Sequence, residues 1–161
     1  MYPKIHYEIF DGNTYTCLDA VRHHIIEIAV VRSPFPKDSS LQMIQTAMEN
    51  FYTIGSTKPL TVEELNHVPL IIYRRWKEFF DQLLETPNYF CVSDDARTCM
   101  QWAQRGYGIG LAPASIAKKE DNAYPIQDLS MQSNICIVTS KNNYISNSAK
   151  ALLDYLSLIH I

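Results

Sequence analysis

The sequence has no excess of positive charge, and this shortage argues against one broad class of function. Its 161 residues carry 14 Lys or Arg against 17 Asp or Glu, which gives a net charge of -3. Charged residues make up 19% and hydrophobic residues 47%, an ordinary composition for a folded globular chain. Proteins that hold duplex DNA need a positive face that displaces counterions from the phosphates. We therefore expect that this chain does not bind DNA by itself.

The sequence also lacks the marks of export and of membrane insertion. No apolar run approaches about 18 residues, and Met1-Tyr2-Pro3-Lys4 leads straight into strand-like sequence with no export signal. The four cysteines form no C-x-x-C pair. These patterns predict reduced, mostly buried thiols in a cytoplasmic protein with no membrane partner.

The first third of the sequence reads as a strand, a helix and a second strand. Apolar and polar residues alternate over residues 5–9, which predicts a half-buried strand. Asn13 or Thr14 then caps a helix. The nearly continuous apolar run of residues 26–31 favours a strand buried on both faces, as in a parallel sheet, and Arg32 ends it.

The rest of the sequence continues to alternate helices with short strands. Thr61 and Glu64 have the spacing of a capping box at a helix start. Residues 70–73 form a short buried strand, and a helix running to Arg105 is expected to turn Cys99, Trp102 and Ala103 inward before Gly106 ends it. This alternation predicts an α/β fold with mostly parallel sheets.

Several segments, in order along the chain, resemble the effector-binding domain of LysR-type transcriptional regulators. They are Tyr2-Pro3, Gly12-Asn13-Thr14, Ile28-Ala29-Val30-Val31-Arg32, Leu60-Thr61-Val62-Glu63-Glu64-Leu65, Pro69-Leu70-Ile71-Ile72-Tyr73 and Gly106-Tyr107-Gly108-Ile109-Gly110-Leu111-Ala112-Pro113. The resemblance covers nearly the whole chain and implies the two-lobed, type 2 periplasmic-binding-protein-like fold with two crossovers. Lobe one is then residues 1–50 plus 131–161, and lobe two is residues 51–130.

The resemblance also implies the function of the chain and indicates that DNA binding belongs to another domain. It implies a ligand-sensing and dimerising domain that binds a small metabolite in the cleft between the lobes, and forms a homodimer or higher oligomer. DNA is reached only through the winged helix-turn-helix, which this chain does not contain. The family's first strand and helix also have no counterpart before Met1.

In the first lobe, the candidate ligand-binding residues are Arg32, Asn13 and Thr14. Arg32 ends a strand at the edge where ligands bind in open α/β sheets, and its planar guanidinium suits a carboxylate. Members of the family often hold an effector carboxylate at the matching position. The alternatives are a surface ion pair for Arg32 and simple helix capping for Asn13 and Thr14.

In the second lobe, the candidates are Arg74, Arg75 and Trp76, which follow the strand of residues 70–73. The resemblance places the matching loop on the opposite side of the cleft, so that arginines from both lobes favour an anionic metabolite, a carboxylate or a phosphate. Adjacent residues diverge, so only one arginine of the pair is expected to face the ligand. Trp76 either caps the pocket or begins an apolar core stripe.

The sequence indicates neither a cofactor nor catalysis. The pair His23-His24 lacks the four-residue spacing of a helical metal site. The glycines at 106, 108 and 110 do not fit a nucleotide loop, because Leu111 stands where the third glycine is needed. No motif pairs a nucleophile with a base. A sensory module is therefore preferred over the two alternatives, a solute-binding protein or a small α/β enzyme using the same cleft.

Overall fold

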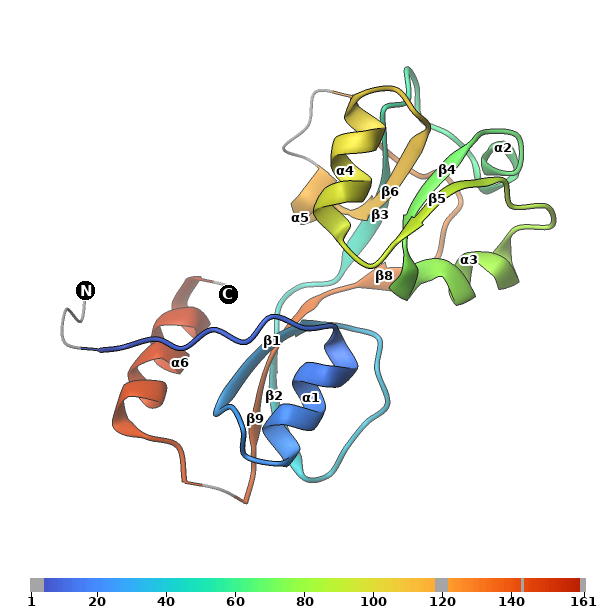
Figure 1. The fold of residues 1–161 in the computed structure, drawn as a ribbon. Helices are drawn as coiled ribbons and strands as arrows, with labels where there is room; N and C mark the ends of the chain where they lie inside the picture. The colour runs from blue at the N-terminus through green and yellow to red at the C-terminus, as the bar shows by residue number, and fades with distance from the viewer. Residues whose placement is uncertain (1–4, 118–121, 143, 160–161) are drawn as a thin grey trace. The chain divides into compact units, whose positions relative to one another are not determined.

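The structure is a computed structural model that describes residues 5–117, 122–142 and 144–159 (Figure 1). The chain forms two compact units, which are described separately. Unit one is Met1–Met48 with Ser133–Ile161, and unit two is Glu49–Gln132. The chain thus passes between the units twice, after Met48 and after Gln132. The predicted lobe boundaries, at residues 50/51 and 130/131, lie two residues from these passages.

Unit one is a three-stranded sheet with a helix packed on one face. The strand order is β1-β9-β2, and both pairings are antiparallel. Leu18 and Val21 of the helix pack against Val31 and Val138 of the sheet. The elements are α1 (Thr14–Arg22), β1 (Ile28–Arg32), β2 (Leu41–Gln45), β9 (Ile135–Ser140) and α6 (Asn147–Ile159).

The prediction of a parallel sheet is wrong for unit one, and the burial of β1 gives the reason. An uninterrupted apolar run suggested two covered faces. In the structure Ala29 and Val31 face α1, whereas Val30 is 55% exposed. The strand therefore has one covered and one open face, which is typical of antiparallel sheets.

Unit two is a larger mixed sheet with helices around it. Its strand order is β5-β4-β6-β3-β7, with β8 pairing β3. Strand β4 pairs in parallel with β5 and β6, whereas β3 pairs in antiparallel fashion with β6 and β7. The strands are β3 (Glu49–Ile54), β4 (Leu70–Tyr73), β5 (Tyr89–Ser93), β6 (Ile109–Pro113), β7 (Ala123–Pro125) and β8 (Gln132–Ser133). The helices are α2 (Val62–Leu65), the 3-10 turn η1 (Arg74–Trp76), α3 (Lys77–Leu83), α4 (Ala96–Gln104) and α5 (Ala114–Ala117).

Strand β4 confirms the prediction that residues 70–73 form a short buried strand. Leu70, Ile71 and Ile72 are all 0% exposed. Ile72 packs into a core with Phe51 and Phe80, and Ile71 packs against Cys99 and other residues on the opposite side. A strand that is covered on both faces carries apolar residues at every position, and the sequence of residues 70–72 shows this continuous apolar run.

Local sequence signals in unit two are also confirmed. Thr61 Oγ1 accepts the backbone N–H of Glu64 at 3.1 Å, and the Glu64 carboxylate accepts the backbone N–H of Thr61 at 2.9 Å. Gly106 ends α4 with φ at +78°. A Cβ on Gly108 would lie 2.6 Å from the carbonyl oxygen of Pro69, so only glycine fits there.

Two further expectations are wrong. Residues 5–10 carry no strand in the described structure, and Tyr7 and Ile9 are 57% and 88% exposed. The alternation of apolar and polar residues is typical of a strand, but no strand among the described residues pairs with this segment. Trp102 is 38% exposed, whereas Cys99 and Ala103 of the same helix are buried as predicted. The indole extends past the covered stripe of α4 to lie against Phe90 and Tyr107.

Candidate functional site

Arg32 is the last residue of β1 and stands at the carboxyl end of the strand, as predicted. Arg32 is half-buried, and its Nη1 donates a long hydrogen bond of 3.5 Å to the hydroxyl of Ser133. Ser133 donates in turn to the backbone carbonyl of Ser33 at 2.7 Å. A guanidinium held beside a hydroxyl at a strand end has the donors that a carboxylate or phosphate requires.

Arg32 adjoins a polar cluster made of Ser33, Thr46, Ser133 and Asn134. Asn134 is 3% exposed, and its Nδ2 donates to the carbonyl of Thr46 at 3.0 Å. Its Oδ1 accepts from the hydroxyl of Ser33 at 2.5 Å, while that hydroxyl accepts the backbone N–H of Asn134 at 3.0 Å. The backbone N–H of Ile135 donates to the hydroxyl of Thr46 at 3.1 Å.

The polar cluster lies where the chain leaves unit one and where it returns to it. Thr46 lies just before the chain leaves unit one after Met48, and Asn134 lies just after the chain returns at Ser133. Ser33 directly follows β1. The cluster therefore joins the end of β1 to both passages of the chain, within unit one.

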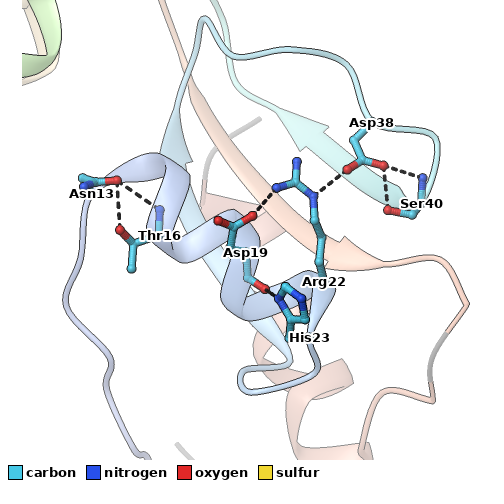
Figure 2. A network of polar contacts seen from close by, with 7 residues as sticks. All are labelled: Asn13, Thr16, Asp19, Arg22, His23, Asp38 and Ser40. Atoms are coloured by element: carbon cyan, nitrogen blue, oxygen red, sulfur yellow. Dashed lines mark hydrogen bonds and ion pairs between the residues drawn. The ribbon is translucent and has the colours of Figure 1, made fainter.

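Asn13 and Thr14 lie at the start of α1. Asn13 is the N-cap residue, and its Oδ1 accepts the backbone N–H of Thr16 at 3.0 Å and the Thr16 hydroxyl at 3.1 Å (Figure 2). Thr14 is buried, with 7% exposure. Only five residues separate α1 from β1, so the helix runs back along the strand. The N-terminus of α1 and Arg32 are therefore at the same end of unit one.

Arg22 fixes the other end of α1 to the loop that follows β1. Its Nε donates to Asp38 at 2.6 Å and its Nη1 to Asp19 at 2.5 Å (Figure 2). Asp38 also accepts from the backbone N–H of Ser40 at 2.8 Å and from the Ser40 hydroxyl at 2.6 Å. The hydrogen bonds from Ser40, and then that from Arg22, lower the pKa of Asp38 from 3.8 to about 2. This network is structural, and it holds the loop that begins at Ser33.

Arg74, Arg75 and Trp76 form η1 at the carboxyl end of β4 in unit two, and the two arginines have different partners. Arg74 is exposed, and its Nε lies 2.7 Å from Asp94. Arg75 is half-buried, with its guanidinium 5.0 Å from the centre of the Trp76 ring. Trp76 is 4% exposed and packs edge-on against Phe51, with centroids 5.1 Å apart. Its observed contacts are those of the core, and its ring supports Arg75.

The described residues contain no group of three or more His, Cys, Asp or Glu side chains placed to hold a metal ion. The cysteines are free, and Cys17, Cys99 and Cys136 are buried. Burial, the largest cause, raises the pKa of the Cys99 thiol to about 11. A thiol in that state is a poor nucleophile at neutral pH.

Sequence analysis does not single out Ser33, Ser133 and Asn134, although Ser133 bonds to Arg32 and the other two belong to the same polar cluster. The signal present in the sequence is weak. Ser33 directly follows a predicted strand, and Ser133 and Asn134 directly precede another. Polar residues at strand ends are common, and only the pairing of β1 with β9 shows that these two ends meet.

Comparison with known proteins identifies the family. The model of the LysR substrate binding domain matches residues 1–157. The search of curated proteins finds no match. No helix among the described residues is long and apolar enough to cross a membrane.

Several solved structures share the fold at low sequence identity. One is the C-terminal domain of a probable LysR family regulator from Rhodococcus sp. RHA1, with TM-score 0.78, 12% identity, and coverage of 97% of this chain and 86% of that one. The effector binding domain of QuiR in complex with shikimate gives TM-score 0.73 and 15% identity, with coverage of 94% and 79%. The BenM effector binding domain with its effector benzoate gives TM-score 0.72 and 18% identity, with coverage of 98% and 80%.

Full-length regulators are longer than this chain, which spans 58% of full-length BenM. The matched family consists of substrate-binding domains of transcriptional regulators rather than of enzymes. The fold agrees with this match, because the solved neighbours are effector-binding domains of the type 2 periplasmic-binding-protein kind. The chain belongs to the LysR substrate-binding domain family.

Proposed function

We propose that this chain senses a small anionic metabolite, a carboxylate or a phosphate, and that Arg32 is its principal anion-binding residue. The observation that carries the proposal is the placement of Arg32 at the carboxyl end of β1, half-buried and beside the hydroxyl of Ser133. Ligands of open α/β sheets bind at such strand ends. The chain's membership of a substrate-binding family makes a small molecule the natural ligand.

The remaining donors at this end of unit one suit the same ligand. Asn13 and Thr14 begin α1, whose first backbone N–H groups favour negative charge. The Thr16 bonds occupy Asn13 Oδ1, and Nδ2 of the same amide serves as a donor to the ligand. Hydroxyl and amide donors beside a guanidinium would orient the carboxylate or phosphate as well as neutralise it.

In unit two we propose Arg75 as the contributing arginine. Arg74 is exposed and paired with Asp94, whereas Arg75 is held over the Trp76 ring and is partly withdrawn from water. A guanidinium fixed by stacking loses less conformational freedom when it binds an anion. Trp76 then acts as a positioning residue for Arg75.

In the complete regulator, we propose that ligand binding modulates transcription by shifting the balance between conformations. Such a shift requires the ligand to bind one conformation better than the other. The regulator would work in the cytoplasm as a homodimer or higher oligomer, and would contact DNA through a domain outside this chain. Shikimate and benzoate, bound by QuiR and BenM, are both carboxylates and supply the first ligands to test.

Calorimetric titration of this chain with matched anionic and neutral ligands tests the proposal. The panel pairs benzoate with benzamide and shikimate with its methyl ester, and adds sugar phosphates. At least one anion is expected to bind, and its neutral partner to bind much more weakly. Arg32→Ala should weaken the anion about tenfold or more, because hydrogen bonds to charged groups contribute about 1.5–3 kcal/mol.

The control is Lys37→Ala, which removes a positive charge from an exposed side chain of the same unit. It should leave the affinity unchanged, and circular dichroism should show that both variants remain folded. Equal affinity of the Arg32→Ala variant and the unsubstituted chain would contradict the role of Arg32. Binding of neutral ligands in preference to anions would contradict the ligand class.

A further inference from the structure

Two of the cysteines, Cys91 and Cys99, belong to one packed cluster of side chains in unit two. Cys91 lies in β5, and Cys99 lies in α4, which begins three residues after β5 ends. Because this connection is so short, the first turn of α4 lies close to the end of the strand that it follows. Cys99 belongs to that part of the helix.

The pairing of β5 with β4 shows which way Cys91 faces. Cys91 is paired with Ile71 in parallel register, so the two side chains are neighbours on one face of the sheet. Ile71 belongs to the same buried cluster as Cys99 and Ala103 of α4. The next residue of β5, Val92, packs into the core on the opposite face, as strand alternation requires. Cys91 therefore lies under α4, on the side of the sheet that carries Cys99.

Helix α4 packs close to the sheet, and the two thiols are near enough to influence each other. A Cβ on Gly110 of β6 would lie 2.8 Å from the Cβ of Ala103, so the glycine permits this close approach. The charge of Cys91 is the second cause, after burial, of the raised pKa of the Cys99 thiol. The Cys99 thiol also contacts the backbone of Ser93, which lies two residues beyond Cys91 in β5.

The cysteines differ in their access to solvent. Cys91 is half-buried, whereas Cys99 is 4% exposed. In unit one, Cys17 and Cys136 are 8% and 0% exposed. Oxidation of thiols follows their exposure, so a small oxidant reaches Cys91 first and meets Cys99 as its nearby second thiol.

We propose that Cys91 and Cys99 form a reversible disulfide when the chain meets a hydroperoxide, and that this bond ties α4 to β5. The Cys91 thiolate attacks the outer oxygen of the peroxide and becomes a sulfenic acid, while the O–O bond breaks and the departing alkoxide or hydroxide takes up the proton that Cys91 gave up. The Cys99 sulfur then attacks the Cys91 sulfur, the S–O bond breaks, and the hydroxyl leaves as water with the Cys99 proton. The two thiols lose two electrons, which the peroxide gains.

The second attack takes place within one folded unit, and this offsets the small thiolate fraction of the buried Cys99 thiol. A low-molecular-weight thiol restores both free cysteines by exchange, which makes the bond reversible.

Peptide mapping of the unsubstituted chain tests the proposal. Trypsin cleaves after Arg97, so Cys91 and Cys99 fall on separate peptides, residues 78–97 and 98–105. The folded chain is treated with hydrogen peroxide, its remaining thiols are alkylated, and the digest is analysed by mass spectrometry. The two peptides are expected to be linked, with the loss of two hydrogens from their summed mass, and a reductant should separate them.

Single variants test the order of the two steps. In the Cys91→Ser chain, Cys99 should stay reduced, because the oxidant does not reach the buried thiol. In the Cys99→Ser chain, Cys91 should stop at the sulfenic acid, which dimedone traps. Oxidation of Cys99 in the Cys91→Ser chain would contradict this order. Circular dichroism shows whether each variant remains folded.

The matched control is Cys17→Ser, which removes a buried thiol of unit one and should leave the linkage unchanged. Met48 is 55% exposed, and its conversion to the sulfoxide shows that the oxidant is active. If Cys91 and Cys99 stay unlinked when Met48 is oxidised, or pair equally with Cys17 or Cys136, the proposal is overturned. The experiment uses no anionic ligand, so its result is independent of the proposed sensing function.

Discussion

Asn134→Ala is expected to destabilise unit one, and the size of the effect follows from its contacts. Truncation removes the bond from Asn134 Nδ2 to the Thr46 carbonyl and the bond from the Ser33 hydroxyl to Oδ1. Each of the two bonds contributes about 1 kcal/mol net, and the cost of one of them rises to as much as about 3 kcal/mol when its buried partner is left unsatisfied. Because Asn134 is 3% exposed, water does not readily replace it, and we expect a loss of about 2–4 kcal/mol.

Urea denaturation followed by two signals measures this effect. Both tryptophans, Trp76 and Trp102, are in unit two, so their fluorescence reports on that unit. Far-ultraviolet circular dichroism reports on both units. At a urea dependence of about 1–3 kcal/mol per molar, the loss lowers the midpoint of the unit one transition by about 1 M or more.

Asn50→Ala is the matched control for this substitution. Asn50 is exposed in unit two, where its Oδ1 accepts a single bond from Gln132 at 2.8 Å. Exposed bonds of this kind contribute little, so the expected change is below about 0.5 kcal/mol. A loss below about 1 kcal/mol on Asn134→Ala would refute the reasoning that the polar cluster fixes the end of β1 and both passages of the chain.

Two more predictions concern packing and charge. Phe80→Ala should destabilise unit two by about 3–5 kcal/mol by tryptophan fluorescence, because Phe80 is 0% exposed. Tyr155→Ala in unit one, where the side chain is 59% exposed, should have little effect on the transition followed by circular dichroism. Asp38 has a folded pKa of about 2 against an ordinary 3.8, so its stabilisation is complete above 3.8 and is lost as pH falls towards 2. Asp38→Asn should therefore reduce the fall in urea midpoint between about pH 5 and pH 2; an unchanged slope would contradict the Ser40 and Arg22 contacts.

The sequence predicts best those elements whose cause is local. The capping box of Thr61 and Glu64 needs only residues three apart, and it is present. The end of α4 at Gly106 and the strand of residues 70–73 are likewise encoded in a few adjacent side chains. The division into two units is contained in no local pattern, and in the sequence only the family resemblance implies two lobes.

The wrong and missed predictions share one cause: the burial and pairing of a residue depend on which distant part of the chain packs against it. Residues 26–31 are apolar enough for either kind of sheet, and only the return of β9 beside β1 makes the pairing antiparallel. Trp102 falls on the predicted inward stripe of its helix, but a long side chain at the edge of the stripe reaches out to Phe90. Ser133 reaches Arg32, and Asn134 reaches Ser33, from 101 residues further along the chain, a separation that no sequence spacing reveals.

The polar cluster also bears on why Arg32 is suited to binding. A free arginine loses much side-chain entropy when it binds an anion, and this loss reduces affinity. Here Ser133 accepts from Arg32, Ser33 holds Ser133, and Asn134 holds Ser33. The fold has therefore fixed part of the arginine's geometry before a ligand arrives, as preorganised sites do. Because the same residues adjoin both passages of the chain, the proposed anion site and the connections to unit two share one set of hydrogen bonds.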